Sequence, residues 1–418
     1  MGSGHGACTG EAAQGRGCIC KAAPSEVLPT HRSSPGFGKQ GRYTILPLAG
    51  PMSRKSQLHA ETNPMSDHQI GLTVSNRILD RFKSLLYLPS PSSREQAIAA
   101  EIESQVAAMD LTPQRDAGGN VWVELEGEEP SLPRWLYAAH MDEIGLVVTK
   151  VRDDGNLEVA RNGGLYPWKL GETPVEVLGD GEAVLGVLSM GSLHIPQEKR
   201  NPVDWDATWI ETGLTKEQVL ARGVRPGSSA VPHAAVRGPI VFGDPDDPMA
   251  GSWTFDDRLG CAILLELLQD LVGSGAKPRR NTAIAFVHNE EIGGFGAKNL
   301  ARKLQPETFI AIDGAPVPPD APLVVNDQPV AWSKDTIAHF DHALMKELLA
   351  AGREVGVEVQ TVVYSSAASD ASMSFAAGWV DRALTFGCAR GNSHGYELLK
   401  LAVLENSLKV LARFVATR

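Results

Sequence analysis

The segment 282–312, TAIAFVHNEEIGGFGAKNLARKLQPETFIAI, decides the fold class. Its first apolar run, Thr282–Val287, has the length and composition of a buried strand. A glycine-rich turn follows, then a helical pattern over 297–304 and a second apolar run over 309–312. Regular alternation of strand and helix is typical of an α/β domain.

The same alternation extends outward from this segment. Helical spacing begins at Leu72 and recurs over 94–109, 258–272, 336–351 and 398–415, and further strands are expected at 120–125, 135–139 and 382–386. Between 148 and 246 the pattern changes to short alternating runs separated by Gly and Asp turns, with one short helix announced by a capping box of Thr215 and Gln218. We therefore expect a mixed sheet flanked by helices, built from 65–147 and 247–418, with a small β-barrel domain inserted at 148–246.

Composition excludes several classes of partner. The chain has 418 residues, 43% of them apolar, and a formal charge of −11, so a nucleic acid would be repelled. No apolar stretch approaches the length that crosses a bilayer, which argues against a membrane partner. Three of the five cysteines lie in the first twenty residues, leaving no disulfide framework and favouring a reducing, cytoplasmic location.

Residues 1–64 differ from the rest of the chain. They are rich in Gly, Ser, Ala and Pro and lack sustained strand or helix periodicity. We expect a disordered leader, or a start codon assigned too far upstream with Met65 as the true start. A transit peptide is the remaining interpretation, because the segment is poor in acidic residues.

Polar residues that bind metals follow several of the expected strands. His140 and Asp142 follow one strand, Glu290 and Glu291 another, and Asp313 a third. A loop after the strand at 382–386 leads to His394, and the pair Asp256–Asp257 precedes a helix. Ligands of open α/β sheets bind beyond the carboxyl ends of strands, so these side chains are expected to converge. Any one of them alone would be an ordinary cap, turn or surface residue; their convergence indicates a metal site.

Other metal-site motifs are missing from the sequence. It has no HExxH, which excludes a helix-borne single-zinc protease. His288 and Glu290 have the spacing of a deaminase motif, but the PCxxC that completes that motif is absent.

Four motifs in order resemble the glutamyl aminopeptidase family, also called tetrahedral or TET aminopeptidases and sometimes named endoglucanases. They are AHMDEIG at 139–145, FDDR at 255–258, EEIG at 290–293 and ID at 312–313. The resemblance covers 72–415 and includes WIETG at 209–213 and RGVRPG at 222–227 in the insert. One departure follows the last ligand, where the family has a Glu four residues on and this chain has Glu397 three residues after His394.

The resemblance implies a zinc-aminopeptidase-like fold and a centre of two divalent metal ions, zinc by preference and cobalt or manganese as alternatives. One ion would take His140 and Asp313, and the other Glu291 and His394. Asp256 would bridge the two ions, and its peptide bond to Asp257 would be cis. Two such ions are balanced by three carboxylates and a hydroxide. Asp142 would orient His140 by accepting the proton of its other ring nitrogen.

The resemblance also implies the reaction and the assembly. Glu290 would act as general base in hydrolysis of the first peptide bond of short peptides, whose free amine one metal would bind. The insert would form dimers that assemble into a dodecamer. Two alternatives stay open: a glycosidase that pairs Glu290 or Glu291 with a second carboxylate, and a metal-binding assembly protein without activity.

Overall fold

Parallel strands form the centre of the large sheet. The computed structural model describes residues 67–192, 194 and 203–418. The strand order is β1-β2-β12-β3-β13-β17-β15-β16, with β14 paired to β17. In it β12, β3, β13 and β17 run parallel, while β2 and β15 pair antiparallel to β12 and β17. The bounds are β1 Gln114–Arg115, β2 Val121–Leu125, β3 Trp135–His140, β12 Thr282–Val287, β13 Thr308–Ile312, β14 Ala315–Pro316, β15 Pro329–Lys334, β16 Gln360–Val363 and β17 Arg382–Arg390.

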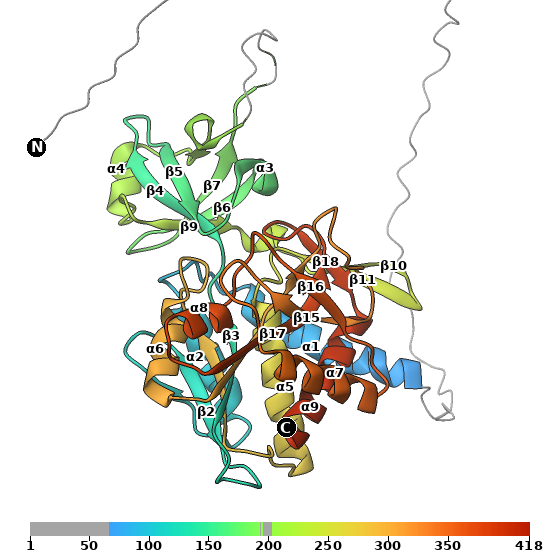
Figure 1. Cartoon of the computed structure of the whole chain (residues 1–418). Coiled ribbons are helices and arrows are strands. Elements are labelled where there is room, and N and C mark those ends of the chain that lie inside the picture. The colour runs from blue at the N-terminus through green and yellow to red at the C-terminus, as the bar shows by residue number, and fades with distance from the viewer. Residues whose placement is uncertain (1–66, 193, 195–202) are drawn as a thin grey trace, which may run out of the picture. The chain divides into compact units, whose positions relative to one another are not determined.

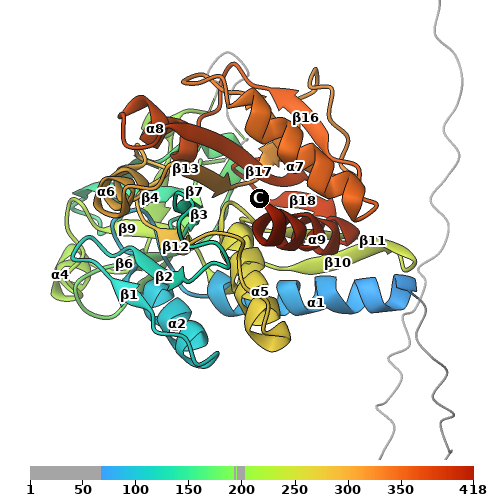
Figure 2. The same cartoon turned by 60° about the horizontal axis from the view of Figure 1, so that its bottom comes forward.

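Helices cover both faces of this sheet (Figure 2). α5 packs against β3 together with α1 and α9, and α7 packs on α9, while α6 and α8 pack together on the other face. The bounds are α1 Asp67–Leu86, α2 Gln96–Ala107, α5 Arg258–Ser274, α6 Phe295–Leu304, α7 His342–Glu354, α8 Asp370–Ala376 and α9 Ala402–Thr417. Because β3 and β12 are buried along their whole length, they carry apolar residues at nearly every position rather than at every second one, the exceptions being His140 at the end of β3 and Thr282 at the start of β12.

A closed barrel interrupts this α/β arrangement, drawn in green in Figure 1. Its strand order is β4-β5-β8-β7-β6-β9. The bounds of its elements are β4 Gly145–Val151, β5 Leu157–Asn162, α3 Pro167–Leu170, β6 Thr173–Leu178, β7 Val184–Ser189, β8 Trp209–Glu211, α4 Lys216–Ala221 and β9 Ser229–Pro232. α4 begins with the expected capping box of Thr215 and Gln218. The expected fold class, a mixed sheet flanked by helices with an inserted barrel, is confirmed.

Some expectations fall outside what is described. The interpretation of residues 1–64 lies outside the described residues, as does part of the insert, 193 and 195–202. Among the residues that are described, no helix is both long and apolar enough to cross a membrane.

The segment from β17 to α9 differs from the sequence expectation in two places. β17 continues to Arg390 instead of ending at 386. The helix expected from 398 begins at Ala402, because Glu397–Lys400 forms β18 and pairs with β11 (Asp247–Ser252). β11 pairs in turn with β10 (Ile240–Asp244), which gives a small separate sheet. Partners far away in the sequence decide these boundaries, so local periodicity missed them.

The helix expected over 336–351 was placed too early. α7 begins at His342, because Asp341 caps it by accepting the backbone N–H of Leu344. Upstream, the Asp335 carboxylate accepts the N–H groups of Ile337 and Ala338 and fixes a turn. Aspartate side chains compete in this way with helix formation.

Buried charges join the two stretches of chain that connect the barrel to the α/β domain. Glu143 precedes β4, Arg237 follows β9 and Arg258 begins α5, and all three side chains are buried. Arg258 Nη2 lies 2.7 Å and Arg237 Nη1 3.0 Å from the Glu143 carboxylate. Burial alone would raise the pKa of Glu143, but the two guanidinium groups lower it to about 2. The folded pKa is below the ordinary 4.5, so these pairs stabilise the fold fully above that pH and lose this effect as the pH falls towards 2.

Glu143→Gln should lower the free energy of unfolding by about 3–5 kcal/mol, because two buried guanidinium groups lose their counter-charge. Urea denaturation at neutral pH measures this. Glu126→Gln is the matched control, since its pair with Lys277 is exposed, and it should change stability by less than about 1 kcal/mol. Equal stability of the two variants would contradict the role assigned to Glu143.

Candidate metal centre

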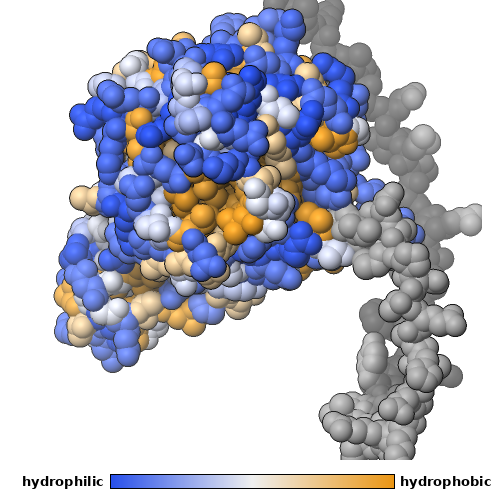
Figure 3. All heavy atoms as spheres, turned by 90° about the horizontal axis from the view of Figure 1, so that it is seen from below, coloured by the Kyte–Doolittle hydropathy of each residue, from blue (hydrophilic) through white to orange (hydrophobic). Residues whose placement is uncertain are grey.

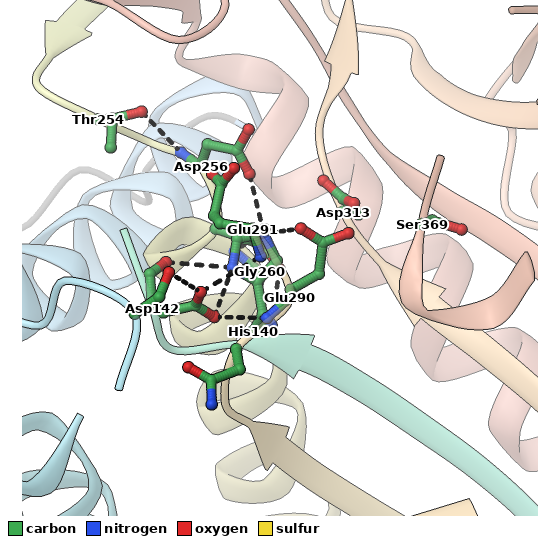
Figure 4. A network of polar contacts seen from close by, with 12 residues as sticks. His140, Asp142, Thr254, Asp256, Gly260, Glu290, Glu291, Asp313 and Ser369 are labelled. Atoms are coloured by element: carbon green, nitrogen blue, oxygen red, sulfur yellow. Dashed lines mark hydrogen bonds and ion pairs between the residues drawn. The ribbon is translucent and has the colours of Figure 1, made fainter. Parts of the chain in front are cut away.

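The parallel strands bring the predicted side chains to one edge of the sheet. His140 ends β3, Glu290 and Glu291 follow β12, and Asp313 follows β13. The register sets Val287 opposite His140, so the residues after both strands lie at the same level. Figure 4 shows the His140 ring and these three carboxylates gathered at one place.

Two further residues arrive from outside the sheet. Asp256 lies between β11 and α5, and its peptide bond to Asp257 is cis, as the resemblance implied. Asp257 caps α5 through the N–H of Gly260 and also accepts the backbone N–H of His140. His394 lies between β17 and β18 with a φ of 57°, in the left-handed region. Loop conformation therefore determines where this histidine points.

The residues expected as ligands form two groups that share Asp256. In each group the ligand atoms lie within 4.8 Å of one another. The groups are His140, Asp256 and Asp313, and Asp256, Glu291 and His394. This division is the one that the resemblance implied for two ions.

Glu290 belongs to neither group but lies beside them. Its Oε2 is 3.9 Å from Nε2 of His140, and its side chain reaches the cavity described below. Burial raises the pKa of Glu290 well above its ordinary range, and the nearby carboxylates of Asp370 and Asp313 raise it further. A carboxylate placed next to ligands without joining them is suited to accept a proton.

Main-chain carbonyls orient both histidine rings. Nδ1 of His140 lies 3.1 Å from the carbonyl oxygen of Asp142, and Nδ1 of His394 lies 2.9 Å from that of Gly164. A carbonyl only accepts, so these contacts assign the proton to Nδ1 in each ring. The other ring nitrogen, Nε2, is then the atom available to a metal ion in each histidine, and it faces Asp256, at 3.1 Å from His140 and 3.5 Å from His394.

The barrel domain thus takes part in the site. Gly164 lies between β5 and α3, and a Cβ added there would come within 2.6 Å of the His394 ring. The neighbouring Gly163 has a φ of 80°, and a Cβ there would lie 3.3 Å from the Glu291 carboxylate. These two glycines let the backbone of the insert approach the ligands closely.

Asp142 acts on the site in more ways than expected. Its carboxylate lies 3.5 Å from Nδ1 of His140, farther than its own carbonyl oxygen at 3.1 Å. It also accepts the backbone N–H groups of Glu290 and Glu291, at 2.9 and 3.2 Å, and the hydroxyl of Ser92 at 2.7 Å. Asp142 therefore fixes the turn that carries both glutamates as well as the histidine.

Two further residues, Arg390 and Glu397, support the ligands, although the local sequence pattern indicates no role for either. Arg390 donates to the Asp256 carboxylate and pairs with Glu397, Nη1 to Oε1, at 3.2 Å. Glu397 accepts the backbone N–H of Asp256 at 3.0 Å and that of His394 at 3.1 Å. The one signal in the sequence was the spacing around His394, where Glu397 lies three residues on instead of the four that are usual in the family.

The donor set fits divalent cations. Burial, together with neighbouring carboxylates, raises the pKa of Glu291 to about 7 and that of Asp313 to about 6. Oε1 of Glu291 is buried without a hydrogen-bond partner. Burial would also raise the pKa of Asp256, but the Arg390 guanidinium and the rings of His140 and His394 together lower it well below its ordinary range. Cations placed among these oxygen and imidazole donors would stabilise the charged carboxylates.

The centre opens into a cavity of about 720 Å³. Asp256, Glu290, Glu291, Asp313 and His394 all line it. Its other walls come from the loop after β14, from β15, from the segment after β16 and from α3. The space accommodates a small organic molecule directly against the ligand groups.

Comparison with known proteins identifies the family of the chain. The family model described as M42 glutamyl aminopeptidase matches residues 119–410. The chain belongs to this family. Peptide hydrolysis is the activity class of the family, and the match covers both the α/β strands and the barrel.

Individual relatives carry different specificities in their names. Glutamyl aminopeptidase of Lactococcus lactis is 25% identical over 57% of this chain, and lysyl aminopeptidase of Pyrococcus furiosus is 28% identical over 47%. The matched regions span 67% and 55% of those proteins.

A solved structure supports the fold over a longer stretch. The TET1 peptidase of Pyrococcus horikoshii, described as assembling into a tetrahedron or an octahedral shell, is 27% identical with a TM-score of 0.72. The alignment covers 82% of this chain and all of that one.

Gly164→Ala should weaken metal binding about 10–100-fold at the group containing His394, because the added methyl displaces the ring and its carbonyl partner. Calorimetric titration of the metal-free protein with Zn²⁺ or Co²⁺ measures this. Gly273→Ala is the matched control, since a Cβ there meets nothing within 4 Å. Identical titration curves for the two variants would show that Gly164 does not position His394.

Proposed function

We propose that the chain is an aminopeptidase that removes N-terminal residues from short peptides at a centre of two divalent metal ions. One observation carries the proposal: two groups of ligand atoms share Asp256 at the edge of a cavity that also holds an uncommitted glutamate, Glu290. Membership in an aminopeptidase family supports the same reaction.

The residues of the chain have distinct roles in this reaction. The five ligands hold the ions, which when bound supply an acidified water, a polarised scissile carbonyl and an anchor for the free amine of the substrate. Glu290 takes the proton of that water and returns it to the leaving amine, a role worth about 10²–10⁴-fold in rate. The Asp142 carboxylate keeps Glu290 in place by accepting the backbone N–H of Glu290. Arg390 keeps Asp256 charged and oriented.

The choice of metal rests on the donor atoms. Histidine nitrogen and carboxylate oxygen suit Zn²⁺, and the general order of affinities favours Zn²⁺ over Mn²⁺. We propose zinc, with cobalt or manganese as alternatives. We also propose a cytoplasmic location, which the buried, unpaired thiols of Cys261 and Cys388 support.

Assembly into a homo-oligomer is part of the proposal. The insert 148–246 would form dimers, which would assemble further into a dodecamer. Exposed apolar side chains on the barrel strand β7, Leu185 and Val187, support an interface there. One face of the molecule also carries a hydrophobic patch amid hydrophilic residues (Figure 3).

Glu290→Gln should abolish peptide turnover and leave metal content unchanged, because it removes the base and spares the ligands. Metal analysis and peptide assays on the same preparation measure both. Glu291→Gln is the informative partner, since it alters a ligand and should lower metal content as well. Loss of metal from the Glu290 variant alone would mean that the two glutamates have exchanged roles.

A peptide with a free N-terminus should be shortened one residue at a time, while its N-acetylated copy is cleaved at least about 100-fold more slowly. Acetylation removes the amine lone pair that a metal can bind, at a cost of several kcal/mol in the transition state. Mass spectrometry of the two digests measures the difference. Internal cleavage of the acetylated peptide would indicate an endopeptidase, and chelator-resistant release of sugar from a β-glucan would favour the glycosidase.

A further inference from the structure

Side chains without charge form most of the cavity wall beyond the ligands. Among the described residues that line it, Lys169 is the only charged side chain outside the ligand groups, Glu290 and their partner Arg390. The remaining wall includes Trp332, Tyr364, Met373 and the residues 316–319 and 366–368, together with the rings of Tyr166 and Trp168, while Gly164, Gly293, Asn392 and Ser393 complete the lining near the ligands. The charged side chains of the cavity are therefore concentrated at its floor, where the candidate ligands lie, and its walls are nearly uncharged.

The apolar wall next to Asp313 is held in a fixed position. β14 begins two residues after Asp313, and the backbone N–H of Val317 donates to the carbonyl of Arg390 at 3.1 Å. The hydroxyl of Tyr364 donates to the carbonyl of Pro316 at 2.7 Å. The rings of Trp332 and Tyr364 then meet edge to face, with centroids 4.6 Å apart. Hydrogen bonds and ring packing thus tie this wall to the residue that holds Asp256.

The aromatic side chains on the two walls of the cavity differ in their exposure to solvent. Trp332 and Tyr364 are 2% and 5% exposed, whereas Tyr166 and Trp168 on the barrel side are 50% and 68% exposed. A substrate whose first peptide bond lies at the metal centre places its first side chain closest to the floor. We expect the wall of Trp332 and Tyr364, beside Asp313, to receive such a side chain and the barrel wall to contact the rest of the peptide.

A charged first side chain would have no partner on this buried wall. None of the described wall residues there is acidic, so a lysine or arginine side chain would lose its hydration without gaining an ion pair. Apart from Arg390, which pairs with Asp256, the one lysine or arginine among the described lining residues is Lys169; it lies on the barrel side and donates to the carbonyl of Asn392 at 3.0 Å. A glutamate side chain held against Trp332 and Tyr364 would therefore be unpaired as well.

We propose that this site selects peptides whose N-terminal residue has a large, uncharged apolar side chain, such as leucine, methionine or phenylalanine. The inference rests on the proposed aminopeptidase function and names its substrate class. Family membership leaves that class open, because relatives are named for glutamyl and for lysyl substrates. Selectivity of this kind arises from burial of apolar surface in the pocket and typically amounts to 10–200-fold.

The first test compares dipeptides Xaa-Ala with the full, metal-loaded chain, where Xaa is Leu, Met, Phe, Glu or Lys. The value of kcat/KM should be at least about 10-fold higher for the three apolar residues than for Glu and Lys. A highest value for Glu or Lys would overturn the proposal. Turnover of none of the five would contradict the proposed function instead. Calorimetric binding of leucinamide, lysinamide and glutamic acid α-amide would then decide the class, and tighter binding of either charged amide would overturn it.

The second test changes the charge of the wall at one half-buried residue. Val317→Lys should lower kcat/KM for Leu-Ala and raise it for Glu-Ala, shifting their ratio by at least about 10-fold, while Val317→Asp should shift preference towards Lys-Ala. Val324→Lys is the matched control, because Val324 is 60% exposed and outside the cavity lining. An unchanged ratio in both Val317 variants, with metal content and melting temperature preserved, would overturn the proposal.

Discussion

The guanidinium of Arg390 pairs with the carboxylate of Asp256, and much of the site follows from this contact. Asp256 is the only residue that belongs to both groups of ligand atoms in the described chain, so its orientation sets where the groups meet. Arg390 is itself fixed by the buried Glu397, which also holds the backbone of Asp256 and of His394. Removing the positive charge would leave clustered, buried carboxylates without their compensating cation.

Two domains complete the site together. The α/β sheet supplies most of the candidate ligands from its strand ends, but the carbonyl that orients His394 comes from the insert at Gly164. Glu143, which follows Asp142 in the sequence, forms ion pairs with two buried arginines and so holds together the segments that connect the barrel to the α/β domain. A shift of the barrel would therefore move a partner of one ligand directly. The insert is thus a structural component of the centre as well as a candidate interface.

The sequence predicted those parts of the site that local patterns encode. Apolar runs ending at Ala139, Val287 and Ile312 predicted which residues reach the sheet edge, and the structure brings the side chains that follow these runs together. Local patterns could not predict the roles of Arg390, Glu397 and Gly164. These roles depend on contacts across long sequence separations, such as the 230 residues between Gly164 and His394. The start of α9 was misplaced for the same reason, because β18 pairs with the distant β11, whereas the start of α7 was misplaced because Asp335 and Asp341 make local contacts that compete with the helix.

The geometry also separates the reaction from the choice of substrate. The candidate ligands lie at the ends of strands whose positions are fixed by the core, whereas much of the apolar wall lies in loops after β14 and β16. Val317 is tied to Arg390 through its backbone N–H, a bond that any residue except proline can make. Its side chain can therefore change in size or charge while Arg390 still holds Asp256 in place. Proteins of one family can in this way be named for substrates of opposite charge.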